Sequence, residues 1–130
     1  MDAESTLKLA LDHAMFRGVI IVAAAGNQKM VGSTVISRHP WVIPIAACNP
    51  EGLLSAYLNV GHSIGVRGLR APGDGVCSSG TDGQSFPSSG TSIAAPFVTG
   101  TIALLWSMFP SATAQDIKLA VTQRRCGAPA

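Results

Sequence analysis

Charged residues are scarce in this chain of 130 residues: Asp, Glu, Lys and Arg together make up 12% of it, about half of the usual quarter. Aromatic residues reach only 5%, whereas apolar residues reach an ordinary 47%. Intrinsic disorder is excluded, because it requires low hydrophobicity and high net charge. We therefore expect one globular domain at most, with a surface rich in Ser, Thr, Gly and Ala.

Positive charge is neither large nor clustered. The net charge is +2, from nine Lys and Arg against seven Asp and Glu, and the only adjacent basic pair is Arg124 and Arg125. Affinity for nucleic acid or for an anionic membrane grows with the number of phosphates that are neutralised, so these partners need clustered cations. The sequence predicts neither nucleic acid nor a membrane as a partner.

Cysteines are few, and the chain begins without a recognisable targeting segment. Cys48, Cys77 and Cys126 form no CxxC or Cys/His pattern, so we interpret them as structural or free thiols, which leaves the redox compartment open. Two acidic residues occur within the first four positions and no apolar core follows them. No secretory signal is predicted, and the localisation stays unknown.

One uncharged stretch, residues 93–109, approaches the length of a membrane span. Pro96, Gly100 and several hydroxyl residues dilute it, and it follows directly on a polar Ser/Gly segment. We therefore interpret it as a helix buried in protein.

The amino-terminal part indicates an α/β fold. Apolar residues at helical spacing, followed by Gly18 as a carboxyl-terminal cap, predict a helix over residues 4–17. Residues 19–25 are a continuous apolar run rich in β-branched side chains, which predicts a strand buried on both faces. This combination indicates a parallel sheet flanked by helices.

The middle of the chain predicts short strands. Residues 41–47 are a second apolar run, and Pro44 within it suggests a sheet edge or an interruption, because proline cannot donate to a ladder. Residues 64–69 could form a further strand, residues 71–75 a turn, and residues 76–78 another short strand.

The carboxyl-terminal part predicts two helices. Residues 78–90 are Ser, Gly, Thr, Asp and Gln for the most part and predict a polar surface loop. A long helix is expected over residues 92–108, and Thr113 with Asp116 resembles a capping arrangement for a short last helix. The tail, residues 124–130, is expected to be flexible.

Two segments carry residue types that suit acyl-transfer chemistry. Gly90-Thr91-Ser92-Ile93-Ala94-Ala95-Pro96 places the Ser92 hydroxyl at the amino end of a helix, where unpaired N–H groups stabilise an anion. Residues 23–27, Ala-Ala-Ala-Gly-Asn, end the first strand with Asn27, whose amide can donate to an oxyanion. Alone, the first segment reads as an ordinary Ser cap and the second as a turn.

In combination and in this order, the segments resemble the subtilisin-like serine proteases from about Leu7 to Val121. The first segment is similar to the family's nucleophile motif, with Ile93 where Met is usual, and residues 71–73, Ala-Pro-Gly, are similar to a turn that often precedes it. The resemblance implies a nucleophile role for Ser92 and an oxyanion role for Asn27. It also implies a substrate pocket that includes Ala23, Ala24, Ala25, Gly26, Gly90 and Thr91.

The rest of the catalytic machinery is not recognisable. A serine nucleophile needs a His to take its proton and a carboxylate to orient that His. Neither family motif is present, and His13, His39 and His62 are better read as a solvated helix residue and two loop residues. Residues 1–123 are therefore interpreted as the carboxyl-terminal half of a subtilisin-like domain.

Two functions stay open. The first is a serine endopeptidase that acts on peptide or protein substrates, with this chain needing the missing amino-terminal half as a partner for activity. The second is a non-catalytic fragment or pseudoenzyme that binds peptides or a partner chain. The chemistry demands no cofactor, and no acidic cluster predicts a metal site, calcium included.

Overall fold

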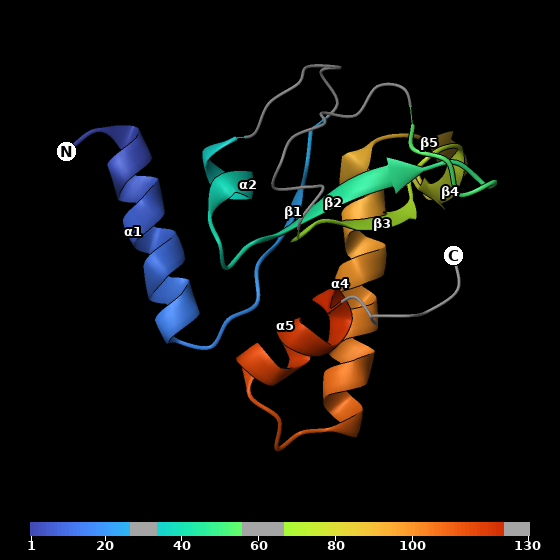
Figure 1. Cartoon of the computed structure of the whole chain (residues 1–130). Helices are drawn as coiled ribbons and strands as arrows, with labels where there is room; N and C mark the ends of the chain where they lie inside the picture. Colours follow the sequence, from blue (N-terminus) through green and yellow to red (C-terminus); the bar gives the residue numbers. More distant parts are fainter. Residues whose placement is uncertain (27–33, 56–66, 124–130) are drawn as a thin grey trace.

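The computed structural model describes residues 1–26, 34–55 and 67–123 of the chain (Figure 1). Its elements are α1 (Ala3–Phe16), β1 (Val22–Ala24), α2 (Val35–Arg38), β2 (Ile43–Cys48), β3 (Leu69–Pro72), β4 (Val76–Ser79), β5 (Ser85–Ser88), α4 (Thr91–Met108) and α5 (Ala114–Thr122). A parallel sheet has the order β1-β2-β3, and β4 pairs antiparallel with β5. The α/β class is confirmed.

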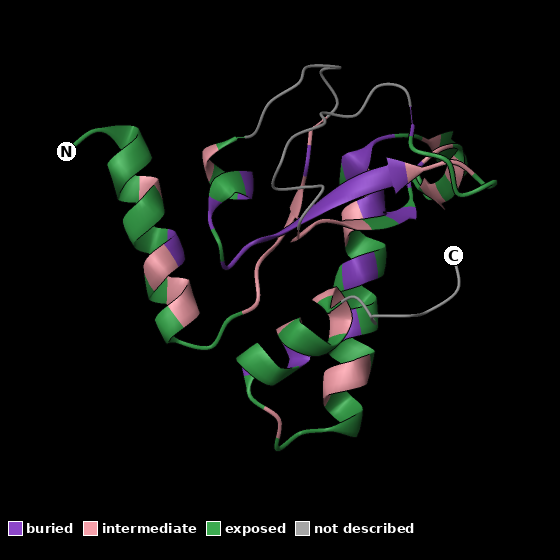
Figure 2. Ribbon diagram, viewed as in Figure 1, coloured by how far each residue is buried: buried purple, intermediate pink, exposed green. Residues whose placement is uncertain are grey.

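The core lies between the parallel sheet and α4. This helix packs against all three strands, and α5 packs against α4 (Figure 1). Burial concentrates in β2 and on one side of α4 (Figure 2). The core cluster consists of Ile43, Ile45, Ala47, Ala71, Ala94, Val98, Ile102 and Ile117.

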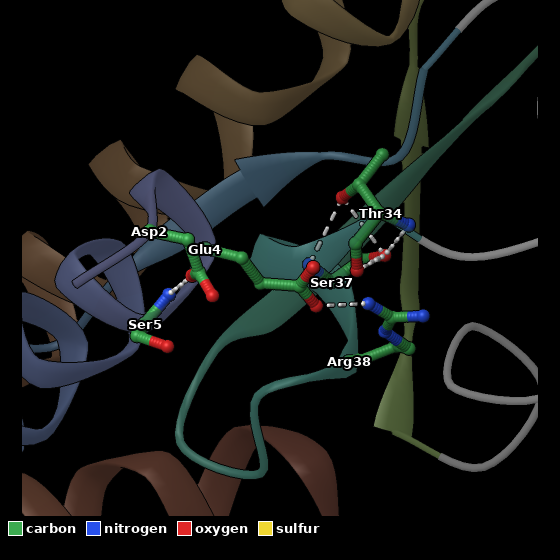
Figure 3. A network of polar contacts seen from close by, with 6 residues as sticks. All are labelled: Asp2, Glu4, Ser5, Thr34, Ser37 and Arg38. Carbon is green, nitrogen blue, oxygen red and sulfur yellow. Dashed lines mark hydrogen bonds and ion pairs between the residues drawn. The ribbon is translucent and has the colours of Figure 1, made fainter.

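The first helix forms as predicted, one residue earlier at each end. Asp2 caps it by accepting a hydrogen bond from the Ser5 N–H at 2.7 Å, and Gly18 follows its end with φ of 70°. The helix lies beside α2, to which the Arg38–Glu4 ion pair of 3.0 Å joins it (Figure 3). This outlying position leaves Leu11 as the only buried residue of α1.

The prediction of a buried strand over residues 19–25 is wrong in extent. The strand β1 covers only Val22–Ala24, its residues are half-buried, and Val19 is 52% exposed. The strand is short and only half-buried because β1 is the end strand of the described sheet and has a neighbouring strand on one side only.

Pro44 does not mark an edge, as its residue type suggested, but lies fully buried in the central strand β2. Ile43 N–H donates to Ile21 on the β1 side at 2.9 Å, so the backbone of Pro44 faces β3. Pairing with β3 begins one residue later, at Ile45. The missing N–H of Pro44 therefore costs the sheet no ladder bond.

The polar segment 78–90 is not a plain loop, because residues 85–88 form β5 and pair with β4. The turn between these strands is closed by Gly80 N–H donating to Gln84 O at 2.7 Å, with Gly83 at φ of 79°. The predicted turn over residues 71–75 is also shorter, since Ala71 and Pro72 belong to β3.

The two carboxyl-terminal helices form as predicted, but only 22% of Thr91–Met108 is buried, so the expectation of a helix buried in protein is wrong for the described structure. The helix α4 has Pro96 in its second turn and is long and apolar enough, by length and composition, to cross a membrane. Its contacts with all three strands identify it as the central helix of an α/β core. Thr113 and Asp116 form both bonds of the capping box of α5.

Candidate active site

Ser92 is the second residue of α4 and is exposed. The cap of this helix is Gly90, which has φ of 148° and offers no side chain to the first N–H groups. The Gly90 carbonyl accepts from Ile93 N–H at 3.0 Å, whereas the N–H of Ser92 has no acceptor among the described residues. The hydroxyl and a free donor thus occur together at the positive end of the helix dipole.

The turn before Ser92 is fixed to the carboxyl edge of the sheet. Gly90 N–H donates to the carbonyl of Gly73 at 2.8 Å, and Gly73 N–H donates to Cys48 O at 3.1 Å. Since Gly73 and Cys48 lie at the ends of β3 and β2, the start of α4 meets the edge where α/β sheets bind ligands.

Gly73 permits this close approach because it has no side chain. A Cβ atom at this position would lie 2.7 Å from Ala47 Cβ, 2.7 Å from Gly90 O and 3.0 Å from Ala94 Cβ. Two of these atoms belong to the β2 strand and the α4 helix, which cannot move independently of the core. The Ala-Pro-Gly motif therefore acts here as a contact point for the turn that carries Ser92.

A second contact joins the end of β1 to the start of α4. Gly26, with φ of 101°, donates its N–H to the hydroxyl of Thr91 at 3.1 Å, and the Thr91 side chain is fully buried. Ala25, the preceding residue, is 2% exposed and donates to Ile45 O at 2.9 Å. The residue before Asn27 is thus hydrogen-bonded to the residue before Ser92.

The structure brings most of the predicted site residues to one place. Ala23 and Ala24 lie in β1, and Ala25, Gly26, Gly90 and Thr91 lie around the Gly26–Thr91 bond. Asn27 lies outside the described residues, and so does His62. The roles of these residues in catalysis and substrate binding stay predictions.

Neither described histidine reaches Ser92. His13 is an exposed residue of α1, as expected. His39 is a buried loop residue just before β2, at the amino edge of the sheet, opposite to the edge of Ser92. Its Nδ1 accepts from Trp41 N–H at 3.2 Å and its Nε2 donates to Asp12 Oδ1 at 2.8 Å, so both ring nitrogens are engaged.

The Asp12–His39 pair is the polar contact that sequence reasoning missed. The two residues are 27 positions apart, on a helix and a loop, and no spacing rule connects them. The hydrogen bond from His39, and then that from Lys8, lower the pKa of Asp12 below its ordinary value. The pair anchors α1 to the segment that enters the sheet.

Arg67 supports the same segment from the other side. Its guanidinium donates to the carbonyls of His39 and Val42, both at 2.8 Å, and of Ser37 at 2.9 Å. Partial burial lowers the pKa of Arg67. Three of its five N–H donors are engaged by these carbonyls before β2, which makes this a structural arginine of the amino edge of the sheet.

Metal ligands do not gather among residues 1–26, 34–55 and 67–123, where no group of three or more His, Cys, Asp or Glu is close enough to hold an ion. Cys48 and Cys77 are free thiols, and Cys126 lies outside the described residues.

Comparison with known proteins decides the family. The sequence matches the Subtilase family, Peptidase S8, over residues 2–125. The chain belongs to the subtilase family. The parallel sheet, α4 and the turn before Ser92 are therefore a subtilisin-like arrangement, as the sequence predicted.

Individual subtilases show the same relationship. The chain is 35% identical to the thermostable alkaline protease of Halalkalibacterium halodurans over 119 residues, which are 92% of this chain and 32% of that protein. It is 34% identical to an extracellular protease of Xanthomonas campestris pv. campestris over 116 residues, which are 83% of this chain and 20% of that protein. Among solved structures, the prenylagaramide maturation protease PagA matches with a TM-score of 0.84 and 27% identity.

The match with PagA covers 98% of this chain and 50% of that chain. The chain thus spans about half the length of PagA and about a third of the alkaline protease.

Proposed function

We propose that this chain supplies the nucleophile and the oxyanion hole of a subtilisin-type serine endopeptidase. The Ser92 hydroxyl attacks the carbonyl carbon of a peptide bond, the amine leaves with a proton from a histidine, and water then hydrolyses the acyl ester. The N–H of Ser92 and the amide of Asn27 donate to the oxyanion. The observation that carries this proposal is the Gly26–Thr91 hydrogen bond, which joins the segment before Asn27 to the segment before Ser92.

The substrate is a peptide or protein held along Ala23 to Gly26 and beside Gly90 and Thr91. The small side chains of residues 23–25 leave this wall open, which suits an apolar or aromatic residue before the scissile bond.

The histidine and its orienting aspartate come from the amino-terminal half of a subtilase domain. His39 supports this part of the proposal, because its ring is engaged by Asp12 and Trp41 at the opposite edge of the sheet. We therefore expect no activity from the 130-residue chain by itself. The alternative function, a non-catalytic subtilase fragment that binds peptides or a partner chain, also predicts no activity from the chain alone. The two functions predict different results only when the amino-terminal half is present.

A fluorophosphonate probe, which phosphonylates only an activated serine with loss of fluoride, separates the two functions. The chain alone and a fusion in which the amino-terminal half of PagA precedes Met1 are labelled side by side. We expect labelling of the fusion only, lost in Ser92→Ala and kept in Ser107→Ala, which removes an exposed hydroxyl from the same helix. Labelling that survives Ser92→Ala excludes the nucleophile assignment. A folded fusion without any labelling favours the non-catalytic function.

A further inference from the structure

A polar contact ties the two ends of the β4–β5 hairpin together shortly before Ser92. The hydroxyl of Ser89 accepts a hydrogen bond from Gly75 N–H at 2.8 Å and donates one to Asp74 Oδ1 at 3.1 Å. A single hydroxyl thus acts as donor and acceptor at once. Asp74 and Gly75 come directly before β4, and Ser89 comes directly after β5. We call these three residues the clasp.

The clasp is continuous with the turn that leads to Ser92. Its neighbours in the chain are Gly73 and Gly90, and Gly90 N–H donates to Gly73 O at 2.8 Å. The two segments are therefore joined twice, once through the backbone and once through the Ser89 hydroxyl. Gly75 and Gly90 have φ of 64° and 148°, and glycine in such conformations has much freedom to lose. Side-chain bonds at this place restrict that freedom.

The hairpin itself gives this turn little support. It lies at the carboxyl end of β3 (Figure 1), and its strands are exposed or half-buried throughout (Figure 2). Within the described part of the chain, the hydrogen bonds of residues 76–88 all join two residues of that range, including the 3.3 Å contact between Ser78 Oγ and Ser88 Oγ. Segments with few buried contacts open most readily. Motion of the hairpin is therefore passed on to Gly90 unless the clasp stops it.

From this arrangement we propose that Asp74 and Ser89 are positioning residues for Ser92. Their contact closes the base of the hairpin and thereby holds Gly90, the start of α4, and with it the hydroxyl and the N–H of Ser92. The inference rests on the proposed function, because it concerns the same serine. The clasp touches no reacting atom and acts only through the Gly90–Gly73 bond.

The chemistry explains why such a hold matters. An oxyanion donor is effective only within about 2.7–3.1 Å of the oxygen on which charge develops. A misplacement of about 1 Å by a distant change can reduce the rate about a hundredfold. A turn that ends in two glycines needs a fixed base to keep Ser92 within this tolerance.

Five variants separate the clasp from the rest of the hairpin. Asp74→Ala and Ser89→Ala are the broken-clasp variants, because each removes one partner of the contact. Asp74→Asn and Ser89→Thr are the rescue variants, because they keep an oxygen acceptor and a hydroxyl. The matched control is Asp82→Ala, which removes a carboxylate that accepts from Gln84 N–H at 3.0 Å in the turn at the opposite end of the hairpin.

Hydrogen exchange of the Gly90 amide tests the hold in the 130-residue chain without any catalytic readout. This N–H is bonded to Gly73 O, and it should exchange about threefold to tenfold faster in the broken-clasp variants, because the turn opens more often. The rescue variants and the control should match the parent. The Ile43 amide, which donates to Ile21 O in the sheet, should be equally protected in all of them. An unchanged Gly90 amide in both broken-clasp variants would overturn the inference, and so would equal acceleration of Gly90 and Ile43, which means general destabilisation.

The fusion with the amino-terminal half of PagA tests the consequence for Ser92. We expect the second-order rate of fluorophosphonate labelling to fall about tenfold or more in the broken-clasp variants and to stay at the parent's value in the rescue variants and the control. With a peptide substrate, kcat should fall while KM changes little, because the loss concerns the transition state. A loss of rate that follows the Tm across all five variants would assign the clasp a merely structural role and refute the inference.

The two tests also separate this inference from the proposed function. If the parent fusion is folded but not labelled, the proposed function fails, and Asp74 and Ser89 cannot be positioning residues for catalysis even where Gly90 exchange responds. If the parent fusion is labelled and the broken-clasp variants are labelled equally fast, the proposed function stands and the inference alone fails.

Discussion

Gly73 shows how much of the candidate site depends on a single missing side chain. Its carbonyl holds Gly90, and its Cα lies close to both β2 and α4. The turn before Ser92 is thus held by backbone contacts rather than by side chains. Another residue at this position would separate the turn from the sheet.

Two glycine substitutions should have opposite effects on stability. Gly73→Ala places a methyl group 2.7 Å from Ala47 Cβ and from Gly90 O, so we expect a loss of about 1–3 kcal/mol in the free energy of unfolding. Gly100→Ala adds the same group to α4 where no atom lies within 4 Å, and should add up to about 1 kcal/mol through helix propensity. Urea unfolding of both variants gives the comparison. A neutral Gly73→Ala would show that the turn moves freely.

The Asp12–His39 contact should make stability depend on acid pH. The pKa of Asp12 is lowered in the folded chain from an ordinary 3.8, so its ionised form stabilises the fold. This contribution is complete above the unfolded-state pKa and is lost as the pH falls through the lower folded-state value. Asp12→Asn should therefore lower the Tm most near neutral pH, and the difference from the parent chain should shrink below about pH 4. A difference in Tm that stays constant down to pH 2 would contradict an ionic role for Asp12.

The three longer helices, α1, α4 and α5, were predictable because their signals are local, whereas the four-residue α2 (Val35–Arg38) lies in a segment that the sequence analysis interpreted as a loop. The Asp2 cap, Gly18 after α1, and the Thr113–Asp116 capping box each lie within four residues of the helix end that they define. The turn before Ser92 was predictable for the same reason. Its residues are contiguous and lead directly into α4.

The limits of β1 and β5 were not predictable, because they depend on the pairing partner of each strand, whereas β4 (Val76–Ser79) matches the strand expected over residues 76–78 within one residue. The apolar run over residues 19–25 carries no sign that β1 ends a sheet, and the polar residues of β5 show no apolar alternation. The prediction from Pro44 was wrong because the register of β3 decides whether a proline is tolerated. The Asp12–His39 pair and the Gly26–Thr91 bond, which spans 65 positions, are likewise set by tertiary structure.

Across the whole molecule, apolar surface remains uncovered. Phe97, Leu104 and Met108 repeat at helical spacing on α4 and are 46%, 71% and 72% exposed. Only 22% of the Thr91–Met108 stretch is buried, although its mean hydropathy is 1.4. A surface of this kind favours association.

The isolated chain should therefore self-associate in solution. We expect its average mass to rise with concentration in sedimentation experiments. The double substitution Leu104→Gln and Met108→Gln should reduce this rise without unfolding the chain, because both side chains are largely exposed. A monodisperse monomer with a cooperative thermal transition would show that the fold is self-sufficient.

The bond between Gly26 and Thr91 also determines when the site can form during synthesis. It joins residues 65 positions apart, so a growing polypeptide that has not yet extended past Thr91 cannot assemble it. The β4–β5 hairpin and α1 need only neighbouring residues and can fold earlier. Ser92 itself emerges one residue after its anchor. A growing chain thus forms this contact beside Ser92 only after every strand of the described sheet has been made.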